Sequence, residues 1–386
     1  MAVAIYGGSF NPPHIGHVHV AEAVRANFNP RHFLVIPAGT PPHKEMAAGS
    51  ASDSERMEMC RLAFAHCGCT VSDIEIKRAG KSYTSDTIRK VKEMYPGERE
   101  ILLVMGTDMF LTLDTWHEAE FILRSVHVIV VRRDEDKLAL RKKALEYAKM
   151  YHTRTTIVAL KPVLAASSDV RELLPKRGGR EVLPEKVYEY IISRRLYGAK
   201  PEWDWLRQEA YAMLKPKRIP HVRGCEEEAV RLAKRWGEDS EKAAESAILH
   251  DITKKLNLRE QLILCGKYGI IPDTLEANSE KLLHSKTGAA IARERFGVSN
   301  EVYESIKWHT TGKADMSLLD KIIYMADYIE PNRDFEGVDA LRELAYTDLD
   351  KAMVLGFEMS LEDLARYKVQ PHPNTMEALD WYRRDE

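Results

Sequence analysis

The stretch AIYGGSFNPPHIGH, residues 4–17, decides how the first half of this 386-residue chain is interpreted. An apolar strand, residues 3–6, is followed by a Gly-Gly-Ser turn and two prolines, and a helix is expected to begin near Ile15. A strand, a glycine turn and a helix in this order are typical of α/β proteins that hold a phosphate at the helix N-terminus. The stretch therefore predicts an α/β unit with an anion site directly after its first strand.

Two histidines distinguish this turn from one that carries only glycines. His14 and His17 stand three positions apart, on one face of the first helical turn. Gly7 and Gly8 let the backbone approach a phosphate closely, and Ser9 offers a donor. Two imidazoles and a helix N-terminus can hold a triphosphate and stabilise a leaving pyrophosphate. The motifs GxxxxGK[ST] and GxGxxG are absent, which disfavours an ordinary NTPase and a dinucleotide-dependent oxidoreductase. The simpler interpretation is a capped helix with incidental histidines.

Apolar strands alternate with helical patterns through the first half of the chain. The predicted strands cover residues 3–6, 33–37, 71–76, 101–105, 127–131 and 155–160. The predicted helices cover residues 17–27, 53–66, 85–94, 118–124, 137–149 and 185–195. This alternation predicts a doubly wound parallel sheet of the α/β class, with helices on both faces. Ligands bind beyond the carboxyl ends of such strands, where the glycines and polar clusters of this sequence fall.

The architecture changes at GAKPE, residues 198–202, beyond which the strand pattern ends. The helical segments expected there cover residues 203–214, 225–236, 240–249, 258–268, 285–296, 302–309, 318–328 and 338–367. A chain of this length favours two domains. We therefore expect an α/β domain over residues 1–198 and an all-α helical domain over residues 201–386.

The composition narrows the classes of function and cellular location. With 57 basic and 59 acidic residues the net charge is −2, which argues against a protein that binds nucleic acid through bulk charge. No apolar run reaches the length of a membrane span, and the immediate N-terminal strand differs from a secretory signal. Five cysteines suit reduced thiols in a cytoplasmic protein. His66, Cys67 and Cys69 could bind a metal, although buried or partly exposed thiols are the simpler interpretation.

The first 195 residues resemble a known family. GGSFNPPHIGH resembles the signature of the HxGH-type nucleotidylyltransferases, and in its full form that of the bacterial nicotinate-nucleotide adenylyltransferases. Four further segments resemble motifs of that family: PAGTPPHK at 37–44, YTSDT at 83–87, GTD at 106–108 followed by Trp116, and AASSDVR at 165–171. The last segment departs from the family pattern, because Ala165 and Ala166 stand where isoleucine and serine are usual.

The resemblance implies transfer of AMP from ATP to nicotinate mononucleotide, giving deamido-NAD and pyrophosphate, with Mg²⁺ bound to ATP and with His14 and His17 as catalytic residues. The residues implied on the ATP side are Gly7, Gly8, Ser9, Phe10, His14, His17, Gly106, Asp108, Arg133, Ser168 and Arg171. The residues implied on the mononucleotide side are Lys44, Thr84, Thr87 and Trp116. A core position is the alternative for Trp116, and a solvated pair with Arg132 is the alternative for Arg133. Ser168 is also expected to cap its helix.

The second half carries histidines and aspartates in its helical segments. They are His221, His250, Asp251, His284, His309 and Asp327. Imidazole and carboxylate suit iron, manganese or zinc and an activated hydroxide. Each of these residues stands within or near the end of a helix, so a bundle could gather them in its core. A lone histidine in such a helix is more often structural, but an ordered set of this size favours a metal centre.

This set resembles the HD-domain metal-dependent phosphohydrolases, and among them the bacterial family that hydrolyses diadenosine tetraphosphate symmetrically to two ADP. The segments that carry the resemblance are RIPH at 218–221, ILHDITK at 248–254, HSKTGA at 284–289, IKWHTTG at 306–312 and KIIYMADYIEPNR at 321–333. It implies a binuclear metal centre, with iron preferred to manganese or zinc, held by the six residues named above, with a metal-bound hydroxide and with Asp251 as a catalytic residue. It implies phosphate contacts by Lys254, Thr310 and Arg333. The chain departs from the family pattern at Val222, where serine is usual.

The two motif sets together predict a bifunctional cytoplasmic enzyme whose partners are small-molecule nucleotides: ATP, nicotinate mononucleotide and diadenosine tetraphosphate. We expect no nucleic-acid or membrane partner, and a homo-oligomer remains open. One alternative makes the second half a nucleotide-sensing regulatory module or a phosphohydrolase of another nucleotide. Another keeps the first fold but changes the acceptor to a different mononucleotide or a phosphopantetheine-like molecule.

Overall fold

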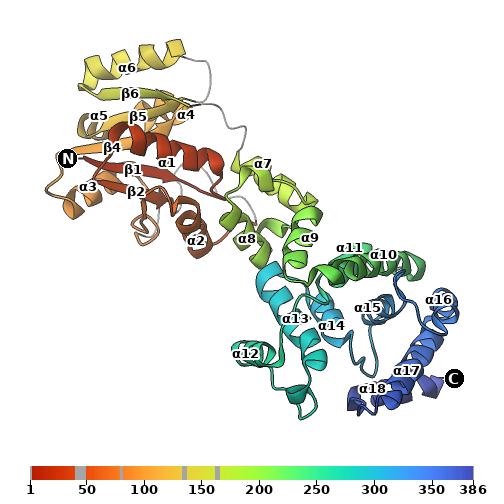
Figure 1. The fold of residues 1–386 in the computed structure, drawn as a ribbon. Coiled ribbons are helices and arrows are strands. Elements are labelled where there is room, and N and C mark those ends of the chain that lie inside the picture. Colours follow the sequence, from red (N-terminus) through yellow and green to blue (C-terminus); the bar gives the residue numbers. More distant parts are fainter. Residues whose placement is uncertain (1, 40–48, 79–80, 133–136, 161–165, 386) are drawn as a thin grey trace. The chain divides into compact units, whose positions relative to one another are not determined.

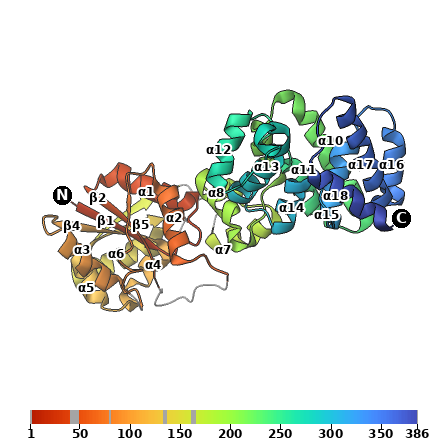
Figure 2. The ribbon, with the colours of Figure 1, turned by 90° about the horizontal axis from the view of Figure 1, so that it is seen from below.

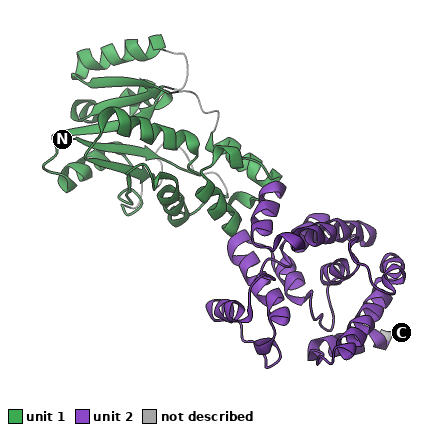
Figure 3. Ribbon diagram, in the orientation of Figure 1, with its two compact units in different colours: residues 1–200 green, residues 201–386 purple. Residues whose placement is uncertain are grey.

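The chain forms two compact units, Met1–Lys200 and Pro201–Glu386, which are coloured separately in Figure 3. This computed structural model describes residues 2–39, 49–78, 81–132, 137–160 and 166–385. Within that part of the chain, no helix combines the length and the apolar character needed to cross a membrane.

The first unit is built on a six-stranded parallel sheet in the order β3-β2-β1-β4-β5-β6 (Figure 1). Its strands are β1 (Ala2–Gly8), β2 (His32–Pro37), β3 (Thr70–Val71), β4 (Glu100–Gly106), β5 (His127–Arg132) and β6 (Arg154–Ala159). The central strands are buried on both faces and carry continuous apolar runs, as parallel sheets covered by helices require. The α/β fold class expected from the sequence is therefore confirmed.

Helices cover the two faces of this sheet (Figures 1 and 2). They are α1 (Ile15–Phe28), α2 (Asp53–Phe64), α3 (Thr84–Met94), α4 (Thr107–Leu111), α5 (Ala119–Ser125) and α6 (Lys137–Tyr151). Two further helices follow in the chain, α7 (Ser167–Leu173) and α8 (Glu185–Arg194), and α8 packs against α2. Alternate strand residues such as Ile5 and Leu103 share one core cluster with Ile88 of α3, Phe110 of α4 and Tyr147 of α6. Helices α1 and α2 pack against each other and contribute nothing to that cluster, so they cover the opposite face.

The strand order reverses between β1 and β4. From β1 the chain continues outward to β2 and β3, and it then returns to β4 on the other side of β1. The two strands run parallel, with Tyr6 of β1 opposite Val104 of β4, so the loops after Gly8 and Gly106 leave the same edge of the sheet. Such a switch point opens a crevice between diverging loops and is the usual ligand site of a doubly wound sheet.

One predicted strand of this unit is much shorter than expected. The prediction of a strand over residues 71–76 is wrong after Val71, because the chain enters a turn in which Lys77 N–H donates to Asp73 O at 2.9 Å. The two residues of β3 pair with β2 at the sheet edge. Side chains beyond the strand still face inward: Ile74 packs against the core cluster, which explains the apolar pattern.

The second unit is all-α, as expected. Its helices are α9 (Trp203–Ala212), α10 (Ile219–Trp236), α11 (Ser240–Leu249), α12 (Leu258–Tyr268), α13 (Glu280–Phe296), α14 (Asn300–Trp308), α15 (Leu318–Ile329), α16 (Val338–Thr347), α17 (Leu349–Arg366) and α18 (Pro373–Tyr382). Helix α11 packs against α10, α14 and α15, and α13 packs against α14. These five helices form the part of the bundle that gathers the predicted metal ligands.

Several helix boundaries in this unit differ from the predictions. Helix α10 begins at Ile219 instead of residue 225, because Pro220 is compatible with the first helical turn. Helix α13 likewise begins at Glu280, so His284 lies inside it. The run expected over residues 338–367 is two helices, separated at Asp348, whose side chain accepts the N–H of Lys351 and caps the second one.

The C-terminal segment also holds a helix beyond residue 367, where the last predicted helical segment ends. His372 is the N-cap of α18 and accepts the Asn374 N–H, and Pro373 occupies the first helical position. The Nε2 atom of His372 lies 2.7 Å from Asp273 Oδ2, so this histidine joins the new helix to the segment after α12.

Candidate functional site

The Gly-Gly-Ser turn of the first unit is shaped by a buried aromatic ring. Phe10 is fully buried and has a positive φ of 45°, which is uncommon for a side chain of this size. Its ring packs edge-on against Tyr6 and Phe64, with centroids 5.4 and 5.7 Å away. A Cβ atom on Gly8 would lie 3.0 Å from that ring, so the second glycine of the turn is required by the packing of Phe10.

The two histidines of the turn lie against each other, as the i, i+3 spacing predicts. His14 is buried and is the N-cap of α1, and its backbone N–H donates to Nδ1 of His17 at 3.2 Å. The two ring centroids are 3.8 Å apart. Because Nδ1 of His17 accepts this bond, the proton of a neutral His17 ring is on Nε2. The arrangement presents an imidazole N–H donor beside the N-terminus of α1, which suits an anionic oxygen.

Helix α7 holds the loop before α1 in place. Ser167 Oγ donates to Pro12 O at 2.9 Å, and Arg171 Nη1 donates to Asn11 O at 2.6 Å. The Asn11 side chain is buried and accepts the Tyr197 hydroxyl at 2.7 Å. Neither Asn11 nor Ser167 was among the predicted site residues, although both stand inside the quoted motifs.

The prediction that Ser168 caps α7 is wrong. The N-cap is Ala166, and Ser168 is the second residue of the helix. Its hydroxyl is exposed and donates to Asp169 Oδ1 at 3.1 Å. The helix begins two positions earlier than that cap would place it, and Ser167, its first residue, donates to the Pro12 carbonyl. Ser168 therefore faces solvent at the start of a helix whose preceding residues, 161–165, lie outside the described residues.

A buried arginine fixes the carboxyl ends of β1 and β2. Arg56 of α2 is fully buried, and its guanidinium donates to Ser9 O at 2.9 Å and to Ala38 O at 2.7 Å. It also contacts Asp53 Oδ1 at 2.5 Å. Arg56 escaped the sequence interpretation because the motif around it, an ordinary helical pattern, carries no sign of these long-range bonds.

The loop after β4 completes this edge of the sheet. Gly106 is exposed and is the N-cap of α4, and Asp108 is exposed in the first turn of that helix. A carboxylate there is favoured by the positive end of the helix dipole. Trp116 is partly buried and packs against the core cluster, as the alternative core role expects, and its contact with the mononucleotide stays a prediction. Lys44 and Arg133 lie outside the described residues.

The predicted mononucleotide loop contains a buried acid. Thr84 is the first residue of α3, whereas the hydroxyl of Thr87 is buried and donates to Glu75 Oε1 at 2.7 Å. Arg78 Nη2 donates to the same hydroxyl at 2.9 Å. Burial raises the pKa of Glu75, although the Thr87 hydrogen bond and Arg78 oppose that shift. The Tyr83 ring, at the start of the loop, lies 4.3 Å from the ring of His117, a pair that the sequence interpretation did not single out.

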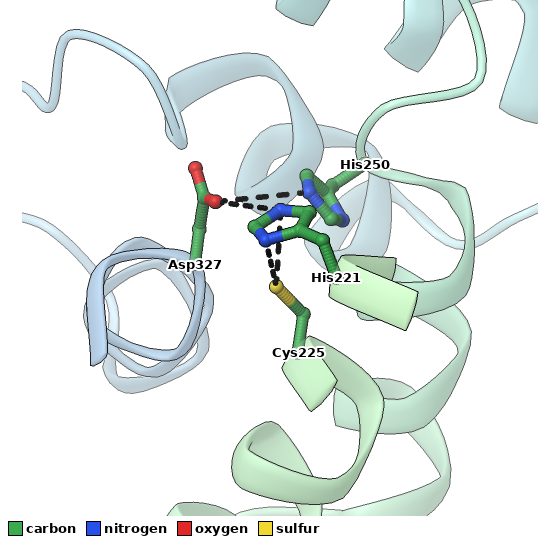
Figure 4. Close-up of side chains that lie close together, drawn as sticks. All are labelled: His221, Cys225, His250 and Asp327. Atoms are coloured by element: carbon green, nitrogen blue, oxygen red, sulfur yellow. Dashed lines mark hydrogen bonds and ion pairs between the residues drawn. The ribbon is translucent and has the colours of Figure 1, made fainter. Parts of the chain in front are cut away.

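In the second unit, the six predicted metal ligands come together in the helical core. His221 lies on α10, His284 on α13 and Asp327 on α15, while His250 and His309 are the C-caps of α11 and α14. Figure 4 shows His221, His250 and Asp327 pointing toward one another from three separate helices. The four histidines and Asp251, which follows His250, are buried.

Each of these imidazoles makes a hydrogen bond through Nδ1. His250, His284 and His309 donate at 2.7 Å to the carbonyl oxygen three residues earlier in the chain. Nδ1 of His221 lies 3.0 Å from Glu330 Oε1. A carbonyl can only accept, so the three former rings carry a proton on Nδ1 and in their neutral form present a lone pair on Nε2.

Asp251 lies between two groups of these nitrogens. Its Oδ1 is 3.1 Å from His284 Nε2 and 3.8 Å from His309 Nε2. Its Oδ2 is 3.5 Å from His250 Nε2 and 3.9 Å from His221 Nε2. Asp327 Oδ1 joins the second group, 3.0 Å from His221 Nε2 and 4.0 Å from His250 Nε2. The two carboxylate oxygens of Asp251 therefore face different groups: Oδ1 faces His284 and His309, and Oδ2 faces His221 and His250.

The donor set fits divalent metal ions. Nε2 of His250 is buried and makes no hydrogen bond within the described part of the chain. Nε2 of His284 and Nε2 of His309 lie 3.0 Å apart, an unfavourable approach for two acceptors unless a proton or cation lies between or beside them. Imidazole nitrogens and carboxylate oxygens in this arrangement are ligands for iron, manganese or zinc.

The electrostatics of the cluster keep its aspartates ionised. Burial alone would raise the pKa values of both, but His250 and Lys254 hold the pKa of Asp251 well below its usual value, and His221 and His250 do the same for Asp327. Burial, with the charge of Lys254, lowers the pKa of His284 to about 3. Two ionised carboxylates beside a neutral imidazole suit a cation.

The predicted phosphate contacts border the same cluster. Lys254 Nζ lies 2.9 Å from His284 Nε2, and the Thr310 hydroxyl lies 3.3 Å from His309 Nε2. Arg333 Nη2 donates to Asp327 Oδ1 at 2.8 Å. Arg218, whose role was not predicted, donates to Asp251 Oδ2 at 2.5 Å. The side chains of Arg218, Lys254 and Arg333 are partly exposed, so each lies between the buried cluster and solvent.

Two further residues at this cluster escaped the sequence interpretation. Cys225 is buried one helical turn after His221, with its sulfur 3.4 Å from His221 Nε2 (Figure 4). Glu330, in the quoted YIEPNR segment, contacts Nδ1 of the same ring.

The group of His66, Cys67 and Cys69, which the sequence raised as a possible metal site, lies in the first unit. The structure places His66 and Cys67 near Glu22, but His66 and Glu22 are largely exposed on the surface.

Both halves of the chain are similar to known proteins. Residues 5–173 match the cytidylyltransferase-like family, and residues 218–332 match the HD domain family. A protein of Citrifermentans bemidjiense named "Probable nicotinate-nucleotide adenylyltransferase" is 36% identical over 214 residues, covering 51% of this chain and 98% of that protein. The symmetrical bis(5'-nucleosyl)-tetraphosphatase of Bacillus subtilis is 37% identical over 180 residues, covering 45% of this chain and 96% of that protein.

A solved structure from Clostridium acetobutylicum is also similar. It is described as a "predicted HD superfamily hydrolase involved in NAD metabolism", is 36% identical, and covers 48% of this chain and 98% of its own, with a TM-score of 0.47. The two curated relatives are each covered almost completely and exceed 30% identity. The chain therefore belongs both to the nicotinate-nucleotide adenylyltransferase family and to the family of symmetrical bis(5'-nucleosyl)-tetraphosphatases, joined in one two-domain enzyme.

Proposed function

We propose that the first unit transfers AMP from ATP to nicotinate mononucleotide, giving deamido-NAD and pyrophosphate, with Mg²⁺ bound to ATP. Membership of the adenylyltransferase family supports the reaction, and the His14–His17 pair at the switch point of the sheet carries the assignment. In this transfer a nucleotide phosphate oxygen attacks the α-phosphorus of ATP and pyrophosphate leaves. The protein has to position the reactants and stabilise charge, and it needs no nucleophile of its own.

Each part of the loop has a role in that transfer. The Nε2–H of His17 would donate to a phosphate oxygen, and the N-terminus of α1 would add its partial positive charge. His14, packed against His17, would hold that ring in place. The proposed ATP contacts are Gly7, Gly8, Ser9, Phe10, His14, His17, Gly106, Asp108, Arg133, Ser168 and Arg171. The proposed mononucleotide contacts are Lys44, Thr84, Thr87 and Trp116.

For the second unit we propose symmetrical hydrolysis of diadenosine tetraphosphate to two ADP. The carrying observation is the approach of four imidazole Nε2 atoms to the carboxylate of Asp251, with Asp327 beside two of them. We propose His221, His250, Asp251, His284, His309 and Asp327 as ligands of a binuclear centre, with iron preferred to manganese or zinc. Bound there, two divalent ions would polarise a phosphate oxygen and activate water.

The hydrogen-bond donors at the edge of the cluster would serve the polyphosphate. Lys254, Thr310 and Arg333 lie within hydrogen-bond distance of His284, His309 and Asp327 respectively. Once metal ions neutralise the cluster, these donors are available to phosphate oxygens. The substrate carries several negative charges, so a partly exposed rim of lysine and arginine beside a buried cation site suits it.

Two assays on the intact, purified chain test these proposals. The first supplies ATP and nicotinate mononucleotide and measures deamido-NAD and pyrophosphate. The second supplies diadenosine tetraphosphate to the metal-loaded chain and separates ADP from AMP plus ATP. Formation of ADP alone supports symmetrical hydrolysis, whereas unchanged substrate with metal bound would favour a nucleotide-sensing module. A screen of mononucleotides and phosphopantetheine-like acceptors in the first assay tests the acceptor.

A further inference from the structure

Glu330 holds one side of the His221 ring. Glu330, directly after α15, is 1% exposed, and its Oε1 lies 3.0 Å from Nδ1 of His221. Asp327, three residues earlier, places Oδ1 3.0 Å from Nε2 of the same ring. The imidazole of His221 is therefore held between two carboxylates that come from one short segment.

This contact differs from those of the other three histidines. His250, His284 and His309 each use the backbone carbonyl three residues earlier to fix their Nδ1 proton. His221 is the third residue of α10, so the residue three positions earlier lies outside the helix. Of these four histidines, His221 is the one whose tautomer depends on a side chain.

The Glu330 carboxylate is itself fixed by Asn332. Its Oε2 accepts the backbone N–H of Asn332 at 2.7 Å and the side-chain Nδ2–H at 2.8 Å. The same Nδ2 also donates to Pro220 O at 3.2 Å, on the first turn of α10. Since buried carboxylate oxygens must be satisfied, these donors leave Oε1 for the Nδ1 proton of His221.

Gly224 makes the space for this carboxylate. A Cβ atom at that position would lie 2.2 Å from Glu330 Oε2 and 3.0 Å from Asn332 Nδ2. Glycine here thus lets the acid lie directly against the backbone of α10, one turn after the ring it contacts. The helix start, the glycine and the segment after α15 form one arrangement around His221.

We propose that Glu330, seated against Gly224 and fixed by Asn332, is a positioning residue that keeps His221 protonated on Nδ1 and directs its Nε2 toward the metal. In this proposal Glu330 acts through the His221 ring and is not itself a metal ligand. The inference rests on the proposed metal centre and adds to it the group that orients one of its ligands. Partners of this kind set the tautomer and basicity of a metal-bound histidine, and their loss weakens metal affinity about 10- to 100-fold.

The test measures Mn²⁺ binding to the intact, metal-stripped chain, using the electron paramagnetic resonance signal of the free ion. Glu330→Ala and Gly224→Ala should each weaken the binding of one Mn²⁺ equivalent by about 10- to 100-fold. Glu330→Gln should retain part of the affinity, because its amide oxygen can still accept from Nδ1. Glu228→Gln is the matched control: Glu228 is also buried on α10 but accepts the Tyr346 hydroxyl at 2.7 Å, and its loss should leave Mn²⁺ affinity unchanged.

A merely structural role predicts a different pattern. It would lower the thermal midpoint of the Glu330 variants and leave Mn²⁺ affinity equal to that of the wild type, which would overturn the inference while the metal centre stands. A wild-type chain that binds no Mn²⁺, Fe²⁺ or Zn²⁺ would overturn both. If Glu330→Ala fails to fold, the Mn²⁺ affinities of Glu330→Gln and Asn332→Ala are compared with that of the wild type. The ¹⁵N chemical shifts of the His221 ring report directly whether Nδ1 keeps its proton.

Discussion

The Nε2 atoms of His284 and His309 lie 3.0 Å apart, and both rings carry their proton on Nδ1, where a backbone carbonyl accepts it. Two lone pairs thus approach each other in a buried site beside Asp251. Burial, with the charges of Lys254 for His284 and of His250 for His309, lowers the pKa of both rings, so protonation of the imidazoles is disfavoured. Lys254 supplies one cationic donor to this pair, with Nζ 2.9 Å from His284 Nε2, and the proposed metal ions would bind the remaining lone pairs.

Removal of metal should therefore destabilise the second unit selectively. A ligand present at 100 times its dissociation constant stabilises the folded state by about 2.7 kcal/mol, and chelation removes that stabilisation. Calorimetry of the intact chain should show a lower unfolding temperature for the second unit after chelation, restored by Mn²⁺ or Fe²⁺. The unfolding temperature of the first unit should stay constant. Equal curves with and without metal would contradict the proposed centre.

His17→Ala should lower kcat for adenylyl transfer by about 10²–10³-fold, the usual effect of removing one preorganised donor from a developing charge. The physical reason is loss of the Nε2–H beside the α1 N-terminus. His19→Ala is the matched control, because His19 lies on the same helix but is exposed. Steady-state rates of pyrophosphate release measure both. Similar rates for the His17 and His19 variants would remove His17 from the site.

Gly8→Ala should destabilise the first unit by about 1–3 kcal/mol, since the added Cβ would lie 3.0 Å from the Phe10 ring in a closely packed loop. Gly106→Ala provides the comparison: at that position a Cβ meets open space and φ is −81°. Urea unfolding of the two variants should separate them clearly. If Gly8→Ala unfolds at the same urea concentration as wild type, Phe10 does not constrain the turn.

His127 should make the stability of the first unit depend on pH. Burial and the nearby Arg154 lower its pKa in the folded state, although Glu100, 3.1 Å from Nδ1, opposes them. Below an unfolded pKa of about 6.5 the unfolded chain binds more protons, so this contribution to stability is present above that pH and is lost as pH falls.

The measurement is the urea concentration at the midpoint of unfolding of the first unit, taken from pH 8 to pH 5. Hydrogen exchange of the backbone amides in β5 monitors the unfolding. The His127→Gln variant should show a weaker fall in stability with decreasing pH than the wild type. His19→Gln, which changes an exposed histidine, should follow the wild-type curve. An equally steep curve for His127→Gln would show that another group causes the dependence.

The sequence predicted the fold because local pattern and global architecture agree in it. Continuous apolar strands and intervening helices specify a parallel sheet, and the prediction failed where tertiary contacts decide the local structure. The side chain of Ile74 faces the core although the strand has already ended. His372 begins a helix because its side chain caps it and because Asp273 holds it from another part of the chain.

The site could be predicted only as far as its motifs reach. The six metal-type residues stand in recognisable segments, and the structure places them together. Glu330 and Asn11 act through partners that are remote in sequence: Glu330 contacts His221, 109 residues away, and Asn11 contacts Tyr197, 186 residues away. No local pattern encodes such contacts. The roles of Glu330 and Asn11 can therefore be inferred only from the structure, in which the fold brings the partners together.

We propose that one chain carries two separate active sites. The most direct measurement assays both reactions on the intact, metal-loaded wild type and on two variants, His17→Ala and Asp251→Asn. We expect the wild type to make deamido-NAD and also to convert diadenosine tetraphosphate to ADP. We expect His17→Ala to lose only the transfer and Asp251→Asn to lose only the hydrolysis. A wild type that lacks either reaction, or a single variant that loses both while folded, would contradict the claim.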